Sequence, residues 1–312
     1  MNPRSKAMLA ILGAILLWST SYVVTKVGVS DMPPLTFGAI RFVVASAVCL
    51  IFRALGKVQP VARKDLGLLC VAGLLGITAY FSLQNLGVQL STAADATLLV
   101  ASFPAVTTVL EMVLFRRRSR WTQFAGIAVA FVGVFIVVRQ GMGAAASNRL
   151  LGDLLLLGTG VAWAFYNFAT RGVVQRYSVM TVVFWQTIFG TLAFLPLSLL
   201  EMRSWHVPGL PGLAGVLFLG TLCSVAAFVL YARGLVSLEP SVAVGLLNLV
   251  PLFGVLAAWA FLGEAITPAQ IIGGVVVVAG VAFIAAREPA RATERQPSPG
   301  CPPEQNAPGS RV

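Results

Sequence analysis

The chain has 312 residues, of which 58% are hydrophobic and only 11% are charged, and its mean hydropathy is +0.88. A soluble domain needs a more polar surface than this, so the composition excludes a soluble globular protein and predicts several membrane crossings. The net charge of +11 would suit a nucleic-acid partner, but the distribution of the basic residues, described below, argues against one.

Ten apolar runs are long enough to cross a bilayer as helices, since about 20 residues span about 30 Å of hydrocarbon. In chain order they are residues 8–28, 34–55, 67–88, 92–115, 121–139, 151–171, 179–200, 211–233, 239–262 and 267–286. Helices are expected because a span in lipid must pair its own backbone groups, and barrel strands would alternate polar and apolar residues. The predicted fold is an all-α integral membrane protein with ten transmembrane helices.

The chain also repeats itself. Residues 13–29 return as residues 158–174, which places Trp18 over Trp163. Each copy holds five of the predicted spans, and an odd number of spans forces the second copy to lie upside down in the bilayer. We therefore predict two inverted five-helix repeats, a plan that recurs in alternating-access transporters.

The repeat and the composition divide the chain into four segments. Residues 1–139 form the first five-helix repeat and residues 151–287 form the second. A Gly/Ala-rich external linker, 140–150, joins them. Residues 288–312 are rich in Pro, Gln and Arg and lack an apolar period, which predicts a disordered cytoplasmic tail.

The basic residues sort to one side of the predicted membrane. If the N-terminus is cytoplasmic, 17 of the 22 Lys and Arg residues fall in cytoplasmic segments, Arg41 lies inside a span, and the other side receives Lys26, Arg139, Arg149 and Arg203. Cytoplasmic loops carry such an excess of Lys and Arg in membrane proteins generally. Both termini are then cytoplasmic, and the positive charge marks topology and not a nucleic-acid site.

Polar and aromatic side chains inside the spans mark candidate binding positions, because they are costly in hydrocarbon and tend to face a bundle interior or a wet cavity. They could line a pocket for a molecule that is partly apolar and partly hydrogen-bonding. The alternative is that they form interhelical hydrogen bonds and interfacial aromatic belts. The candidate substrate-binding residues are Trp18, Tyr22, Arg41, Tyr80, Gln84, Trp163, Asn167, Tyr231 and Asn248.

Arg41 is the single basic residue well inside a predicted span. Three roles are open to it: it could bind a substrate carboxylate, pair with Asp95 or Glu111, or extend outward to the headgroups. Its counterpart in the second repeat, Gln186, keeps the hydrogen bonding without the charge.

Three carboxylates, Glu111, Asp95 and Glu264, are candidates for a coupling proton. Asp95 is placed equally well to stabilise the positive end of a helix dipole, since it opens the fourth span. Pro104 and Pro251 sit at matching positions in the fourth and ninth spans, where a proline removes a backbone hydrogen bond and predicts a kink.

Catalytic chemistry is thinly represented. The sequence contains no Walker A, HExxH or GxSxG motif and no Cys/His cluster, and its one histidine lies in a loop. We expect no enzymatic activity, no cofactor and no metal.

Several motifs resemble those of a known family. They are WSTSYVVTK from residue 18, Arg41 shortly after Pro34, Pro104, and PLFGVLAAWAFLGE from residue 251, followed by a glycine-spaced last span. With these features the chain resembles the drug/metabolite transporter superfamily, specifically its EamA-type ten-helix members, over residues 8–287. The resemblance implies a multi-pass carrier of the bacterial inner membrane with a central cavity between its halves. In one departure, Arg116–Arg117 stand where the second repeat has Gly263–Glu264.

Together these features predict a secondary transporter that exports amino acids or related small metabolites by alternating access. A multidrug efflux carrier is the first alternative, and a membrane-embedded lipid-modifying enzyme is an alternative from another class. The expected partners are a small-molecule substrate and the lipid bilayer, and the sequence leaves a homodimer open.

Overall fold

The computed structural model describes residues 3–116, 121–142, 147–235 and 246–286, and every element within them is helical. The helices, in chain order, are α1 (Pro3–Asp31), α2 (Pro34–Ala54), α3 (Arg63–Gly73), η1 (Leu74–Ala79), α4 (Tyr80–Leu90), α5 (Ala93–Val100), α6 (Phe103–Phe115), α7 (Trp121–Val138), η2 (Arg139–Met142), α8 (Ser147–Thr170), α9 (Val179–Ser198), η3 (Leu199–Ser204), α10 (Leu210–Phe218), η4 (Leu219–Ala226), α11 (Ala227–Leu235), α13 (Leu249–Leu262) and α14 (Pro268–Ala286).

Local sequence accounts for where several helices begin. Pro34 and Pro211 lie in the first turns of α2 and α10, where the missing N–H costs nothing. The Thr92 and Ser178 hydroxyls accept hydrogen bonds from backbone N–H groups in the first turns of α5 and α9. The length of an apolar run therefore determines that a helix forms, and proline or polar capping residues determine where it begins.

The described residues hold seven helices that are long and apolar enough to cross a membrane, or eight if α5 and α6 form one span bent by 43°. Helices α13 and α14 are apolar but shorter. The prediction of ten spans therefore holds only at the coarser level of a multi-pass helical membrane protein. Part of the predicted span 239–262 and the predicted tail 288–312 lie outside the described residues.

Two spans contain a π-helical stretch at matching places in the repeat. One is η1, between α3 and α4, and the other is η4, between α10 and α11. π-Helical turns are rare and often occur at functional sites, since they redirect the side chains that follow. Here η1 precedes Tyr80 directly.

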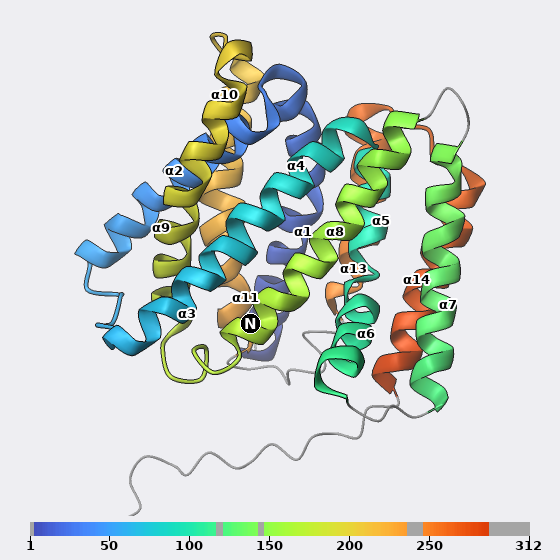
Figure 1. Ribbon diagram of the computed structural model, residues 1–312, viewed down its shortest axis with the longest axis horizontal. Helices are drawn as coiled ribbons and strands as arrows, with labels where there is room; N and C mark the ends of the chain where they lie inside the picture. The colour runs from blue at the N-terminus through green and yellow to red at the C-terminus, as the bar shows by residue number, and fades with distance from the viewer. Residues whose placement is uncertain (1–2, 117–120, 143–146, 236–245, 287–312) are drawn as a thin grey trace, which may run out of the picture.

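The helices of the two halves of the chain interlock. Helix α1 packs on α10, α11 and α13, whereas α8 packs on α3, α4 and α6. Helix α2 packs on α9, and α7 packs on α14. Helices α1 and α8 run in opposite directions (Figure 1), so each half inserts its first helix into the other half.

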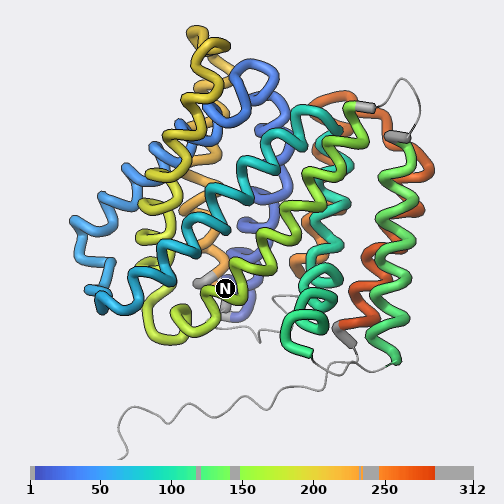
Figure 2. Tube along the Cα trace, in the orientation of Figure 1, coloured from blue at the N-terminus to red at the C-terminus, as the bar shows by residue number. Residues whose placement is uncertain are grey.

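Helices α7 and α14 form a pair at one edge of the bundle, green and orange-red in Figure 2. Gly126 and Gly133 of α7 face Gly273 and Gly280 of α14 so closely that the backbones nearly touch. Small residues allow this approach in membrane helices.

Helices α6 and α13 both end at a residue with an unusual backbone conformation. Arg116 closes α6 with φ 48°, in the left-handed region, and Gly263 closes α13 with φ 65°. Glycine adopts this conformation freely, whereas arginine pays about 1 kcal/mol for it. Helices α6 and α13 belong to the fourth predicted span of each repeat, and both end in the left-handed conformation although the residues differ.

We predict that Gly133→Ala lowers the stability of the α7–α14 pair. A Cβ at Gly133 would lie 2.6 Å from the Val277 nitrogen and 2.7 Å from the Gly273 oxygen, so the backbones must separate. Overpacking of this kind costs about 1–3 kcal/mol, and thermal unfolding of the purified protein in detergent measures it. The control is Gly67→Ala, where nothing lies within 4 Å; equal melting temperatures for the two variants would contradict the prediction.

Candidate functional site

Arg41 of α2 is buried, with only 4% of its surface exposed. Its Nε and Nη2 atoms each donate to the Ser224 hydroxyl at 3.3 Å, and the guanidinium lies 4.3 Å from the centre of the Phe81 ring. Its Nη1 atom is buried without a hydrogen-bond partner. Of the three roles open to Arg41, its burial disfavours extension to the headgroups, and Asp95 forms its ion pair with Arg149 instead.

Two tyrosines flank Arg41. The Tyr22 and Tyr80 side chains lie close enough to each other and to Arg41 for electrostatic interaction. Both are buried, as is Gln84 one turn further along α4. The sequence placed these four residues on three separate spans, and the fold brings Tyr22, Arg41 and Tyr80 together.

Aromatic rings extend this cluster on both sides. On one side the Trp18 ring lies 5.6 Å from Tyr231, and its Nε1 donates to the Cys223 carbonyl at 3.3 Å. On the other side the Trp163 ring lies 5.7 Å from Tyr80 and stacks on Tyr166 at 5.0 Å. The predicted tryptophans of the two repeats thus flank one buried polar centre.

A hollow of about 450 Å³ opens beside Trp163, between α6 and α8. Its walls include Thr107, Glu111, Trp163, Tyr166, Asn167 and Arg171. Asn167 is held there by a hydrogen bond from its Nδ2 to the Trp163 carbonyl, at 2.8 Å. We call this end of the bundle, toward the lower edge of Figure 1, the hollow end.

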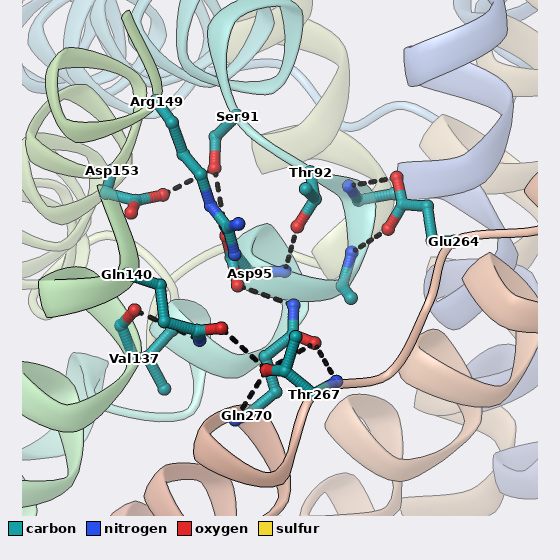
Figure 3. A network of polar contacts seen from close by, with 12 residues as sticks. Ser91, Thr92, Asp95, Val137, Gln140, Arg149, Asp153, Glu264, Thr267 and Gln270 are labelled. Atoms are coloured by element: carbon teal, nitrogen blue, oxygen red, sulfur yellow. Dashed lines mark hydrogen bonds and ion pairs between the residues drawn. The ribbon is translucent and has the colours of Figure 1, made fainter. Parts of the chain in front are cut away.

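The opposite end, where α1 ends and α10 begins, we call the capped end. Here Asp95 is fully buried, and Figure 3 shows Ser91, Arg149 and Gln270 pointing toward it. Arg149 forms an ion pair with Asp95 Oδ2 at 2.6 Å, and Gln270 Nε2 donates to Oδ1 at 2.8 Å. The Ser91 hydroxyl bridges Asp95 to Asp153, a second fully buried carboxylate.

Glu264 has a structural contact at the same end. It lies two residues beyond α13, and its two carboxylate oxygens accept the N–H groups of Ala93 and Ala94 at 2.9 and 3.0 Å. These N–H groups begin α5, so Glu264 caps that helix from across the bundle. Lys26 performs the complementary task, since its Nζ donates to the carbonyls of Val88, Gln89 and Ser91 at the end of α4.

Two further carboxylates cap helices at this end. Asp31 Oδ2 accepts the N–H groups of Gly209 and Gly212 at 2.9 and 3.0 Å, at the start of α10. Glu201 accepts the N–H groups of Leu35 and Thr36 at 3.0 and 2.7 Å, at the start of α2. Each carboxylate comes from one half of the chain and caps a helix of the other.

The remaining predicted positions lie away from the central cluster. Asn248 precedes α13 and is exposed, without a capping hydrogen bond from its side chain. Pro104 lies in the first turn of α6, just after the 43° bend. Pro251 is buried in the first turn of α13. Glu111 lines the hollow and is not at the capped end.

Four residues of these two sites were not predicted from the sequence: Ser224, Tyr166, Arg149 and Asp153. Ser224 and Tyr166 gave no usable signal, because their roles depend on which helices pack together. Arg149 and Asp153 did give one: they are four residues apart at the start of an apolar span, and hence on one face of a helix. Two charges entering a membrane helix on one face indicate a buried polar contact.

Comparison with known proteins identifies the family. The family model described as "EamA-like transporter family" matches twice, at residues 5–139 and 150–286. The chain belongs to the EamA-like transporter family. It is a multi-pass membrane transporter and not an enzyme, so the lipid-modifying alternative is set aside. Within the described residues, no group of three or more His, Cys, Asp or Glu side chains could hold a metal ion.

Individual relatives agree with this family. The chain is 29% identical to a "Probable terminal-alkyne amino-acid exporter" of Streptantibioticus cattleyicolor, over 93% of this chain and 97% of that protein. It is 28% identical to a "Probable amino-acid metabolite efflux pump" of Salmonella typhimurium, over 89% and 94%. A solved crystal structure with 22% identity covers 91% of this chain and 99% of its own, with a TM-score of 0.59, and supports the fold.

His206 adds a contact at the capped end. This histidine lies in the exposed loop before α10, and its Nδ1 and Nε2 atoms lie 3.1 and 2.7 Å from the carbonyl oxygens of Ser204 and Asp31. Carbonyls only accept, so both ring nitrogens can donate only in the imidazolium form. The Ser204 and Asp31 carbonyls therefore raise the pKa of His206 above its ordinary value of 6.5.

We predict that this contact weakens as the pH rises above 6.5, the ordinary pKa of histidine. Because the folded pKa is raised, the contact is fully present below 6.5 and is lost as the pH rises through the folded value. His206 is the only histidine, so NMR of protein carrying isotope-labelled histidine follows its titration without assignment. An apparent pKa at or below that of the urea-unfolded protein would contradict the prediction.

Proposed function

We propose that this transporter exports amino acids or related small organic metabolites across the bacterial inner membrane by alternating access. The printed names of the amino-acid exporter and efflux pump to which it is similar support the substrate class. In this proposal ten spans form two inverted five-helix repeats with both termini in the cytoplasm. The hollow end then faces the cytoplasm and the capped end faces outward, in agreement with the excess of basic residues near the hollow end.

Matching contacts support the inverted repeat. A Cβ added to Gly73 would lie 2.6 Å from the Gln186 carbonyl oxygen, and one added to Gly220 would lie 2.7 Å from the Arg41 carbonyl oxygen. Arg41 and Gln186 occupy equivalent positions in the two repeats, as do Gly73 and Gly220. The same close approach thus occurs twice, each time between a second helix of one half and a third helix of the other.

The contrast between the two ends carries the proposal. A hollow of about 450 Å³ opens at one end, whereas fully buried Asp95 and Asp153 fill the other. A carrier caught facing the cytoplasm has this arrangement. The hollow reaches Trp163, and the Trp163 ring in turn contacts Tyr80 at the central cluster.

The central cluster suits a zwitterionic or neutral amino-acid-like substrate. Arg41 offers an unpartnered N–H that can bind a carboxylate, and a charge-assisted hydrogen bond is stronger than a neutral one. In our assignment Trp18, Trp163, Tyr22, Tyr80 and Tyr231 give the pocket its shape, Gln84 supplies a hydrogen bond at the cluster, and Asn167 supplies one in the hollow. Asn248, which is exposed at the start of α13, is left out of this assignment. One buried cation disfavours a strongly charged substrate.

A carrier of apolar toxic compounds is the second candidate. The observation in its favour is the aromatic wall of the hollow, where Trp163 and Tyr166 stack and Phe168 contributes a third ring. Such surfaces bind apolar molecules without strict geometry. This carrier would not need Arg41, so the Arg41 variant described next separates the two candidates.

We predict that Trp163→Ala and Arg41→Gln each reduce export of the physiological solute by about tenfold or more, the equivalent of about 1.4 kcal/mol. Arg41→Gln installs the residue that the second repeat has at the equivalent position, so packing is preserved while the charge is lost. The measurement compares the metabolites that accumulate in the medium of one bacterial host expressing each variant at equal membrane levels.

Trp121→Ala is the matched control, because Trp121 is 85% exposed on α7, at the edge of the bundle, and its ring contacts only Phe124 among the described aromatic pairs. Export should match that of the unmodified protein. If neither Trp163→Ala nor Arg41→Gln alters export of a solute that the unmodified protein exports, the assignment of the binding site is wrong. If only Arg41→Gln leaves export intact, the second candidate gains.

A further inference from the structure

The geometry points to a proton-binding site at the capped end, formed by Asp153 and Asp95 around the Ser91 hydroxyl. We propose that one proton bound there from the outside keeps this end of the carrier closed, and that its release allows the end to open. The role in transport rests on the proposed function, whereas the site rests on the side chains alone.

The carboxylates outnumber the cations that neutralise them. Asp95 and Asp153 are both fully buried, and Ser91 contacts both. Arg149 is committed to Asp95, with its Nε at 2.8 Å and its Nη2 at 2.6 Å from Oδ2. Asp153 has no such ion pair in the described part of the chain, and its Oδ2 atom is buried without a hydrogen-bond partner.

Other charged groups nearby do not neutralise Asp153. Lys26 of α1 directs its three donors to the carbonyls at the end of α4. Glu264, beside α5, is occupied by two backbone N–H groups. Arg139 of η2, which packs on α8, is exposed, and α4 carries no charged residue. Burying an uncompensated carboxylate would cost several kcal/mol.

A single proton resolves this imbalance. The Ser91 hydroxyl has one hydrogen and cannot donate fully to two carboxylates. If Asp153 is protonated, it donates to Ser91, Ser91 donates to Asp95, and Asp95 keeps Arg149. The Asp153 and Ser91 hydroxyl hydrogens then each have an acceptor, and the group of two acids and one guanidinium is neutral. The unpartnered Oδ2 becomes a carbonyl oxygen, which is cheaper to bury than a carboxylate oxygen.

Loss of that proton to the outside would leave two adjacent carboxylates and one guanidinium. Arg149 provides the path to water, since 24% of its side chain is exposed while Asp95 is fully covered. Two carboxylates that share one hydroxyl as their common partner repel each other when both are charged, and they then demand hydration. The two carboxylates lie on α5 and α8, so hydration of the pair separates these helices and opens the capped end.

The proton is observed directly by infrared spectroscopy of the full-length protein in lipid membranes, through the C=O stretch of a protonated carboxylic acid. We expect a band at neutral pH that weakens as the pH is raised, because burial disfavours the charged form, and that is lost in Asp153→Asn. Asp95→Asn should retain a band only at lower pH, because Arg149 is then available to Asp153. A wild-type spectrum without the band near neutral pH, or an unchanged band in Asp153→Asn, would overturn the site.

Asp65→Asn is the matched control. Asp65 is also buried, but it has its own cation, Arg176, at 2.9 Å and a hydrogen bond from the Tyr177 hydroxyl at 2.7 Å. It needs no proton, so its removal should leave the band unchanged. Loss of the band in Asp65→Asn as well would show that the band does not report on Asp153.

Opening is measured by hydrogen–deuterium exchange of the peptide that contains the first turn of α5, compared between wild type and Asp153→Asn at the same pH. We expect exchange to rise in the wild type at alkaline pH and to stay low in Asp153→Asn, whose neutral amide mimics the bound proton. Equal exchange in the two proteins, or closure by sodium at alkaline pH, would overturn the proton-controlled closure. If the wild-type protein shows the infrared band but exports no amino acid or related metabolite, the proposed function is refuted and the proton site still stands.

Discussion

The constraint that governs this structure is that hydrocarbon offers no partner for a polar group, so each helix end must find one within the protein. The carboxylates of Asp31, Glu201 and Glu264 meet this need at the capped end, where they accept the first N–H groups of α10, α2 and α5. Each of these carboxylates caps a helix that belongs to the other half of the chain. The same hydrogen bonds that finish individual helices therefore hold the two halves together.

The interlocking of the halves extends this dependence inward. Because α1 packs among the helices of the second half and α8 among those of the first, a shift of one half must move residues on both sides of the central cluster. Arg41 shows the consequence: it stands on α2 but donates to Ser224 of η4, and Tyr22 and Tyr80 reach it from two further elements. The two π-helical stretches, η1 and η4, lie in the helices that contact this centre from each half.

Some of this was predictable from the sequence, for physical reasons. The length of an apolar run is a local property, so most spans could be located, and the repeat could be seen because Trp18 recurs as Trp163. That Trp163 lies against Tyr80 and Trp18 against Tyr231 depends on packing between halves, which no local pattern encodes. Glu264 looked like a candidate for proton coupling because a carboxylate near a membrane is costly, but two N–H groups of α5 already satisfy it.

The uneven satisfaction of buried polar groups separates structural from functional carboxylates. Glu264 and Asp65 have complete sets of partners, whereas Asp153 keeps one oxygen unpartnered, as Arg41 keeps one nitrogen. A buried group left incomplete destabilises the conformation that contains it until a ligand completes it. Asp153 and Arg41 lie at different depths, one where the capped end is closed and one where the substrate would rest. A carrier must couple the closure of one end to the binding of its ligands. In our proposals a proton completes Asp153 at the capped end, and the substrate completes Arg41 in the central cluster.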